Sequence, residues 1–384
     1  MKIIVATPMY PPEIAEPAPY VKEVSRRLSN EHVITIVSYA NMTEGHPQAT
    51  FVAVNKKDPL PIRLLKYAYT LFRVSRDANI IYVQGGTAAG LPAVIVGYIR
   101  SISVVLRFNE DEAWERAIQE GTTSKSLESF LKKPEVNFHI RVIMWLQKFA
   151  LHMATVIVTT SHHQKDTLIR KYGIHNTVIT TIYNPAPKEE ILPFPESKVP
   201  HQVAVTTTLT AWSGVDTVIK AVSSLIKEFP NVHLVIAGEG PEKQNLRNLI
   251  IERGLEKNVS LLGHVSRAEQ WHVRTTSAVY VESTLEAGTL DRISWSLLAG
   301  VPVVVSDVPV LNESIENNVS GILIPPADEH ALANAIKKIF TDKDFVNALA
   351  QGRITVLQEK FSWGAHLAGL NAVFNSLYKH ETKQ

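Results

Sequence analysis

Short apolar runs recur along the chain, and each is followed by a longer segment of mixed polarity. Such runs, rich in Val and Ile, are typical of strands that helices cover on both faces of a parallel sheet. Two series alternate with helical segments, which predicts an α/β protein of two doubly wound, Rossmann-like domains. The first series occupies residues 3–6, 33–37, 51–54, 80–83, 104–108, 156–159 and 178–182. The second occupies residues 203–206, 234–237, 259–262, 279–281, 301–305 and 322–324.

A proline-rich stretch separates the two series. Five prolines fall within residues 184–200. Proline cannot continue a helix interior or a central strand, so we place the linker between the domains there. A chain of 384 residues is long enough for two domains that each bury a core.

The composition is that of an ordinary enzyme, with 20% charged and 45% hydrophobic residues. The formal net charge of +2 excludes a strong overall attraction to nucleic acid or to anionic lipid. The lack of cysteine excludes disulfides, thiolate metal sites and a cysteine nucleophile, and the fourteen histidines show no metal-ligand spacing. No secretory signal is visible, because the apolar residues 3–6 run into Pro8, so we expect a cytoplasmic protein.

Residues 80–99 carry no charge and are long enough to cross a bilayer. Gly85, Gly86, Gly90 and Pro92 divide this stretch. We therefore predict a strand, a glycine turn and a helix instead of a membrane span.

Residues 61–77 have the periodicity of an amphipathic helix. Two interpretations stay open for its basic side: a solvated face, or a strip near the acceptor site that meets an anion or a lipid. The second would give peripheral contact with the inner face of the membrane. The predicted apolar face consists of Leu64, Ala68, Leu71 and Phe72, and the basic residues are Arg63, Lys66, Arg73 and Arg76.

A glycine-containing turn follows the predicted strand 234–237. Gly238 and Gly240 allow close approach of a ligand to the backbone, and Glu239 can accept hydrogen bonds from a base or sugar. No G-x-G-x-x-G follows the first strand and no P-loop lysine motif is present, so dinucleotide-binding and P-loop folds lose support.

A second candidate segment lies between the strand 279–281 and a helix predicted to start near Asp291. Backbone N–H groups at such a helix start, from Gly288, Thr289 and Leu290, can hold a phosphate. Glu286 either grips sugar hydroxyls or caps a turn.

Four polar residues, 109–112, end a strand of the N-terminal half. Asp111 is the candidate here for orienting or deprotonating a hydroxyl at the rim of a cleft. The alternative is a solvated acidic loop.

Taken together, the segments resemble the retaining glycosyltransferases of family 4, which have the GT-B fold of two Rossmann-like domains facing a cleft. The resemblance covers nearly the whole chain, and it rests on the order and spacing of several segments. These are residues 1–14, 154–161, 172–173, 182–185, 209–216, 237–241, 312–313, 321–328 and 361–363.

The resemblance implies a domain organisation and an activity. Residues 1–184 form the acceptor-side domain, residues 185–362 bind the nucleotide-sugar, and residues 363–384 form a helix that crosses back to the N-terminal domain. A hexosyltransferase of polysaccharide biosynthesis is implied, which moves a sugar from a nucleotide-diphosphate donor to a hydroxyl of a glycan or lipid-linked acceptor. The anomeric configuration is retained, and no metal or other cofactor takes part.

The resemblance also assigns residues to roles. Glu286 and Asp111 are the expected catalytic residues, and the other assigned residues are expected to hold the donor. These donor-site residues are Thr208, Ser213, Gly238, Glu239, Gly288, Thr289, Leu290, Arg292 and Glu313.

Several positions depart from the family pattern. An Arg and a Lys usually hold the diphosphate, and Thr208 and Ser213 stand in their places. The glutamate that usually grips the ribose is replaced by Trp295, counted back from the glycine at 300. Either another cation such as Arg292 or Arg267 substitutes, or the donor differs, or catalysis is lost. The alternative function is therefore a weak or inactive relative that binds nucleotide, sugar or a partner enzyme.

Overall fold

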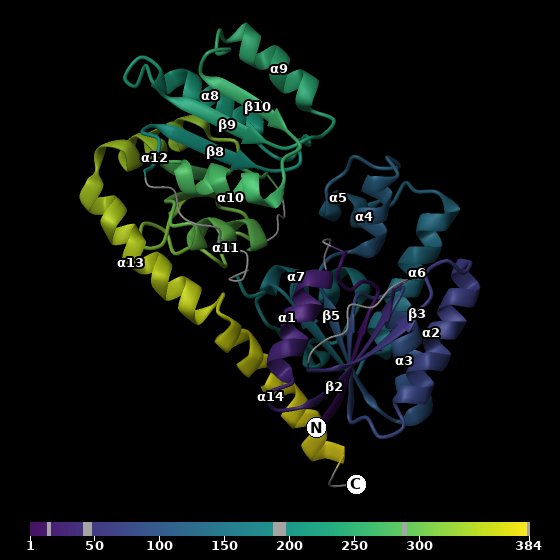
Figure 1. Cartoon of the computed structure of the whole chain (residues 1–384). Coiled ribbons are helices and arrows are strands. Elements are labelled where there is room, and N and C mark those ends of the chain that lie inside the picture. The colour runs from purple at the N-terminus through teal and green to yellow at the C-terminus, as the bar shows by residue number, and fades with distance from the viewer. Residues whose placement is uncertain (14–16, 41–47, 187–196, 286–289, 382–384) are drawn as a thin grey trace. The chain divides into compact units, whose positions relative to one another are not determined.

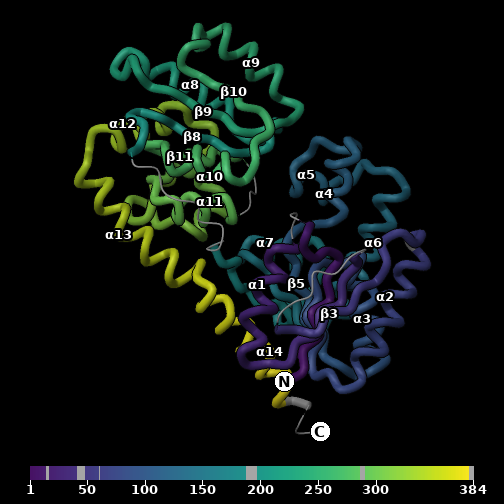
Figure 2. The backbone as a smooth tube through the Cα atoms, viewed as in Figure 1, coloured from purple at the N-terminus to yellow at the C-terminus, as the bar shows by residue number. Residues whose placement is uncertain are grey.

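The structure is a computed structural model that describes residues 1–13, 17–40, 48–186, 197–285 and 290–381. The chain divides into two compact units (Figures 1 and 2). The first comprises residues 1–182 and 367–384, and the second comprises residues 183–366.

The first unit is built on a seven-stranded parallel sheet with the strand order β3-β2-β1-β4-β5-β6-β7. Its strands are β1 (Lys2–Thr7), β2 (Val33–Tyr39), β3 (Thr50–Val54), β4 (Ile80–Gln84), β5 (Ser103–Phe108), β6 (Val156–Thr159) and β7 (Ile179–Thr181). Its helices are α1 (Ala18–Leu28), α2 (Leu60–Val74), α3 (Gly90–Arg100), α4 (Glu112–Gln119), α5 (Leu127–Lys132), α6 (Phe138–Met153) and α7 (His162–Thr167), with single turns η1 (Leu168–Tyr172) and η2 (Asn176–Val178).

The second unit is built on a six-stranded parallel sheet with the strand order β10-β9-β8-β11-β12-β13. Its strands are β8 (Gln202–Thr206), β9 (His233–Ala237), β10 (Val259–Gly263), β11 (Val279–Glu282), β12 (Val303–Ser306) and β13 (Ile322–Ile324). Its helices are α8 (Val215–Leu225), α9 (Lys243–Glu252), α10 (Arg267–Thr276), α11 (Leu290–Leu298), α12 (Glu329–Thr341) and α13 (Lys343–Glu359).

Each apolar run in the sequence forms a strand, which confirms the prediction of two doubly wound domains. Most residues of the central strands are buried because helices cover both faces of each sheet, as in other parallel sheets. The uncharged stretch 80–99 forms β4, a glycine turn and α3, as predicted. No helix in the described parts of the chain is long and apolar enough to cross a membrane.

The last helix, α14 (Trp363–Glu381), begins in the second unit and belongs to the first from Leu367 onward. In the first unit it packs on the sheet face that also carries α1. The Phe374 ring lies edge-on to Tyr82 of β4 at 5.7 Å, and the Tyr82 hydroxyl is 2.6 Å from that of Tyr20 in α1. Residues 363–381 thus form one helix, and its role as the segment that crosses back to the N-terminal domain stays a prediction.

The buried face of α2 differs from the predicted one. Tyr67 is fully buried, and its hydroxyl donates to the Val37 carbonyl at 2.7 Å. Leu71 is buried beside it, whereas Phe72 remains exposed at the surface. The prediction that Phe72 belongs to the buried face was wrong. The buried face is centred on Tyr67, whose hydroxyl bonds to strand carbonyls, and Phe72 lies outside it.

Candidate functional site

Three loops of the second unit meet at the carboxyl edge of its sheet. The loops that follow β8 and β9 are joined by the Leu209 N–H, which donates to the Glu239 carbonyl at 2.9 Å. The loop after β11 is joined to the β8 loop, because the Leu285 N–H donates to the Trp212 carbonyl at 2.8 Å. Ser283 adds a hydroxyl bond to the Ser213 carbonyl at 3.0 Å. Segments far apart in sequence therefore form one surface, at the place where doubly wound sheets bind ligands.

Glycines make this close approach of the loops possible. A Cβ on Gly238 would lie 1.8 Å from the Thr207 carbonyl oxygen, and one on Gly240 would lie 2.3 Å from that of Leu209. Gly214, which precedes α8, has a φ of 66°, and a Cβ there would lie 1.9 Å from the Ser283 carbonyl oxygen. Packing between the loops alone explains why residue 238 is a glycine. Contact between Gly238 and a donor stays a prediction.

The two positions that we expect to replace the family's cations differ in exposure. Thr208 is exposed at the carboxyl edge. Ser213 is buried, and its hydroxyl donates to the Thr210 carbonyl at 2.7 Å. Only Thr208 therefore presents its side chain to solvent.

Glu239 is also exposed and is paired with a cation. Lys243, one turn along, lies 2.5 Å from its carboxylate. The hydrogen bond from Lys243 lowers the pKa of Glu239, with a smaller contribution from its charge. Glu239 is therefore an ionised acceptor at neutral pH.

Arg292 forms a two-pronged ion pair with Glu282, the last residue of β11. Its Nε and Nη2 atoms each lie 2.9 Å from a carboxylate oxygen of Glu282. The Glu282 side chain is only 3% exposed, whereas that of Arg292 is 28% exposed. The cation expected to face a diphosphate is thus already balanced by a buried carboxylate.

A second arginine is buried next to this pair. Arg274 of α10 is 1% exposed and donates to the hydroxyls of Thr206 and Ser296, the latter at 3.2 Å. Its guanidinium lies 5.0 Å from the ring centroid of Tyr280, whose hydroxyl is 3.2 Å from the Glu282 carboxylate. Burial lowers the pKa of Arg274, and the nearby Glu282 charge partly offsets this.

Trp295, which we expect at the place of the ribose-gripping glutamate, is packed between arginines. The guanidinium of Arg267 lies 4.9 Å from its ring centroid and that of Arg274 lies 5.2 Å away. The Trp271 ring packs edge-on at 6.2 Å. Arg267 itself is exposed on the first turn of α10. The Trp295 ring therefore presents an aromatic face that attracts cations.

Two further residues predicted for the donor site, Leu290 and Glu313, are described in the structure. Leu290 is the first residue of α11 and is buried. Glu313 accepts a hydrogen bond from Tyr183 at 3.2 Å, and the neighbouring Asn184 donates to Asp291 at 3.2 Å. Three predicted site residues, Glu286, Gly288 and Thr289, lie outside the described residues.

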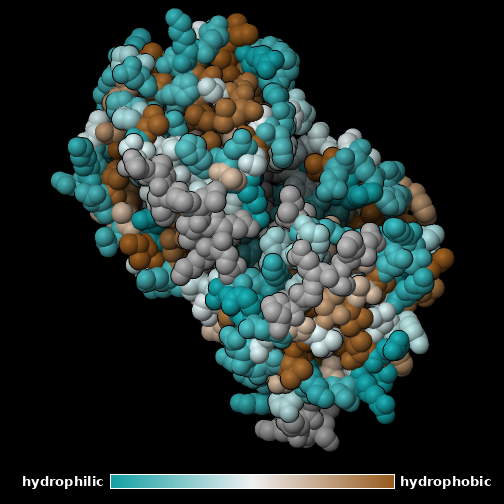
Figure 3. Space-filling view, viewed as in Figure 1, coloured by the Kyte–Doolittle hydropathy of each residue, from teal (hydrophilic) through white to brown (hydrophobic). Residues whose placement is uncertain are grey.

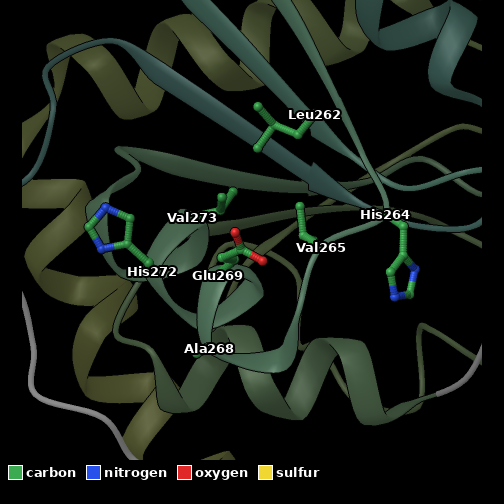
Figure 4. Close-up of a pocket in the computed structure, with 7 residues that line it drawn as sticks. All are labelled: Leu262, His264, Val265, Ala268, Glu269, His272 and Val273. Atoms are coloured by element: carbon green, nitrogen blue, oxygen red, sulfur yellow. The ribbon is translucent and has the colours of Figure 1, made fainter.

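A depression of about 460 Å³ opens beside the same sheet edge, between the end of β10 and α10 (Figure 4). The end of β10 contributes Leu262, the loop after it contributes His264 and Val265, and α10 contributes Glu269 and His272 among others. Ser266 and Glu269 form the reciprocal cap that starts α10.

Asp111, in the first unit, is neither an exposed rim residue nor part of a solvated acidic loop. It is 2% exposed and caps α4, because its carboxylate accepts the Trp114 N–H at 3.0 Å. The Tyr172 hydroxyl donates to its other oxygen, and Gln147 donates to that hydroxyl at 2.9 Å. Burial raises the pKa of Asp111, and the Tyr172 hydrogen bond opposes the rise. The described contacts give Asp111 a structural role, and a catalytic one stays a prediction.

Two family models match adjacent parts of the chain. The Glycosyltransferase Family 4 model matches residues 18–190, and the Glycosyl transferases group 1 model matches residues 188–353. The chain is a family 4-like glycosyltransferase with the GT-B fold. The fold of this glycosyltransferase is shared with Anabaena HepE, solved in complex with UDP, with a TM-score of 0.69. The two are 16% identical, and the match covers 97% of this chain and 99% of HepE.

Curated relatives resemble parts of this glycosyltransferase. An uncharacterized glycosyltransferase of Methanocaldococcus jannaschii is 28% identical over 156 residues, which are 40% of each chain. The alpha-D-kanosaminyltransferase of Streptomyces kanamyceticus is 26% identical over 176 residues, 42% of this chain and 43% of the relative. The matches thus span less than half the length of these relatives.

Two residues of the candidate site, Glu282 and Arg274, were missed from the sequence. Glu282 ends the otherwise apolar run 279–281, and a charge in that position is a signal of a functional or buried pair. Arg274 has no acidic residue within four positions, so the residues around it did not indicate which side chains it contacts.

We expect Tyr172→Phe to lower the free energy of unfolding by about 1.5–3 kcal/mol at pH 7, the usual value of a hydrogen bond to a charged group. The pKa of Asp111 is raised in the folded state, so the stability it contributes is complete below its unfolded pKa and is lost as pH rises through the folded pKa. Without the Tyr172 hydroxyl this loss is larger. The difference in free energy of unfolding between wild type and Tyr172→Phe, measured by urea unfolding, should therefore shrink as the solution is acidified.

The matched control is Tyr39→Phe in the same unit. The Tyr39 hydroxyl donates to the Ala88 carbonyl at 2.9 Å, which is not ionisable. Its removal should cost about 0.5–1.5 kcal/mol and show no such pH dependence. An equal pH response in both variants would contradict the role given to Asp111.

Proposed function

We propose that this glycosyltransferase transfers a sugar from a nucleotide-diphosphate donor to a hydroxyl of a glycan or lipid-linked acceptor. The observation that carries the proposal is the convergence of the β8, β9 and β11 loops at one sheet edge. There Thr208 and Glu239 are exposed, with the Arg292–Glu282 pair behind the β11 loop. Anabaena HepE, which shares the fold, was solved with UDP, so we take UDP as the first ligand to test.

The proposed chemistry is an exchange of one bond to the anomeric carbon for another. The acceptor oxygen attacks that carbon on the face from which the diphosphate oxygen leaves, so the configuration is retained, and the hydroxyl proton is passed to the departing phosphate or a nearby base. Positive groups and helix N-termini stabilise the developing charge. We assign the sugar contact to Glu286 and the diphosphate contacts to the backbone of Gly288, Thr289 and Leu290, without a metal or other cofactor.

A second function is favoured by the charge balance of the site. Thr208 and Ser213 are neutral, and Glu282 balances Arg292. Neutral hydrogen bonds are roughly half as strong as charge-assisted ones. A relative that binds nucleotide or sugar and turns it over slowly or not at all fits these observations.

Calorimetry and donor hydrolysis together test the two functions. Titration with UDP, GDP and ADP measures nucleotide binding, and hydrolysis of a panel of nucleotide-sugars measures turnover. An enzyme should bind one diphosphate tightly and hydrolyse the matching sugar, in the presence of EDTA as well as without it. Binding without turnover on any donor or acceptor supports the inactive relative. A lack of binding to every nucleotide contradicts the enzyme and leaves only a relative that binds sugar.

A further inference from the structure

Three neighbouring helices of the first unit carry basic residues and no acidic ones. Helices α2, α3 and α6 together contain no Asp or Glu in their sequences. Their six basic residues are Arg63, Lys66, Arg73, Arg100, Arg141 and Lys148. The chain as a whole has 37 acidic and 39 basic residues, so this part of the molecule departs from its overall balance.

The same three helices expose large apolar side chains. Phe138 is 82% exposed, Tyr98 is 77% exposed and Trp145 is 64% exposed. Large exposed apolar patches mark surfaces that bind a protein or a membrane, since each aromatic left in water forgoes its burial energy. The exposed apolar residues of the three helices are Ile62, Leu65, Tyr69, Phe72, Ile95, Tyr98, Ile99, Phe138, Trp145 and Phe149.

These residues form one surface because the helices are adjacent. α3 packs against α2 on one side and α6 on the other, and Figure 1 shows the three helices side by side over one face of the sheet. The Arg100 guanidinium of α3 lies 3.7 Å from the ring centroid of Phe72 in α2. Trp145 and Phe149 of α6 stack at 5.9 Å. Part of this apolar surface is visible at the edge of the first unit in Figure 3.

The positive charges of this surface are mostly unbalanced. Within the described parts of the chain, Lys66 alone among the six has an acidic side chain at ion-pair distance, Asp58 at 2.9 Å. Arg73 and Arg100 lie over the rings of Tyr69 and Phe72. Arginine and lysine stems can cover apolar surface while their charged ends reach outward.

We propose that the surface of α2, α3 and α6 binds the face of an anionic lipid bilayer. Exposed aromatics among basic residues match a bilayer interface, where rings enter the headgroup region and cations meet anionic phosphates. A second copy of the chain is a poor occupant, because it would set two positive surfaces against each other. The net charge of +2 is no obstacle, since attraction to a membrane depends on local charge within a Debye length.

This inference goes beyond the proposed function and does not depend on it. Binding to vesicles can be measured without donor or acceptor, and nucleotide titration tests the donor site separately. A failure of one experiment therefore leaves the other interpretable.

The experiment is co-sedimentation of the full chain with vesicles of phosphatidylcholine, with and without phosphatidylglycerol. We expect binding only when the anionic lipid is present, and weaker binding at high salt. Arg141→Glu with Lys148→Glu should reduce binding roughly 30-fold or more, taking about 1 kcal/mol for each lost basic residue. The control, Arg253→Glu with Lys257→Glu, makes the same charge change on exposed residues of the second unit and should bind within about twofold of wild type.

A second pair of variants tests the apolar contribution. Tyr98→Ser with Trp145→Ser should weaken binding at least tenfold, whereas Ile251→Ser, at a residue 56% exposed in the second unit, should not. Circular dichroism and unfolding midpoints show that each variant is folded. The proposal is overturned if anionic vesicles are not bound or if both charge variants lose binding equally. It is also overturned if sedimentation velocity shows that this surface joins two copies of the chain instead.

Discussion

Replacing Arg292 by alanine is expected to lower the free energy of unfolding by about 3 kcal/mol. The change leaves the Glu282 carboxylate, 3% exposed, without its bidentate partner. Breaking a buried pair by removing one partner typically costs about 3–5 kcal/mol, and we expect the lower end because 28% of the Arg292 side chain is exposed. Urea unfolding followed by circular dichroism measures the loss. Arg247→Ala, at an exposed arginine of the same unit, is the control and should change stability by less than about 0.5 kcal/mol.

The double variant Glu282→Gln with Arg292→Met separates structure from donor binding. It removes both charges, so most of the stability should return. If Arg292 also serves the diphosphate, this stable variant should still bind UDP more weakly than wild type. Glu282→Gln alone should then bind UDP more tightly, because Arg292 is no longer balanced. Unchanged UDP affinity in both would restrict Arg292 to a structural role, and a stable Arg292→Ala would contradict the buried pair.

The strands could be predicted because each depends on a local property. An apolar run of three to five residues favours a strand through its own composition, so the predicted runs coincide with β1 to β13. The reciprocal cap of Ser266 and Glu269 was also predictable, since both residues lie within one helical turn.

The charged and polar contacts of the site were less predictable because they join distant segments. Asp111 meets Tyr172, 61 positions away, and this contact converts an expected solvated carboxylate into a buried one. Arg292 meets Glu282 across a strand end, a loop and a helix start. Sequence spacing alone sets no distance across such connections. The burial of Ser213 has the same origin, because the loops that cover it come from β8 and β11.

Restoring a cation at Thr208 is expected to strengthen UDP binding about tenfold. Thr208 is exposed at the edge where the three loops meet, so an arginine can extend from it without burial. A hydrogen bond to a charged group contributes about 1.5–3 kcal/mol, and 1.4 kcal/mol corresponds to a factor of ten in affinity. Calorimetric titration of Thr208→Arg with UDP measures the gain. The control is Ser224→Arg, an equal change of charge at an exposed residue near the far end of α8 from Gly214.

A lysine at position 213, the second expected cation position, should not strengthen UDP binding in the same way. Ser213 is 5% exposed and donates to the Thr210 carbonyl, so Ser213→Lys must displace the loops that cover it. We expect this variant to lose about 1–3 kcal/mol of stability through overpacking, without a gain in UDP affinity. If Thr208→Arg binds UDP no better than Ser224→Arg, the diphosphate does not reach the β8 loop. If Ser213→Lys is stable and binds more tightly, the loop opens more easily than its hydrogen bonds indicate.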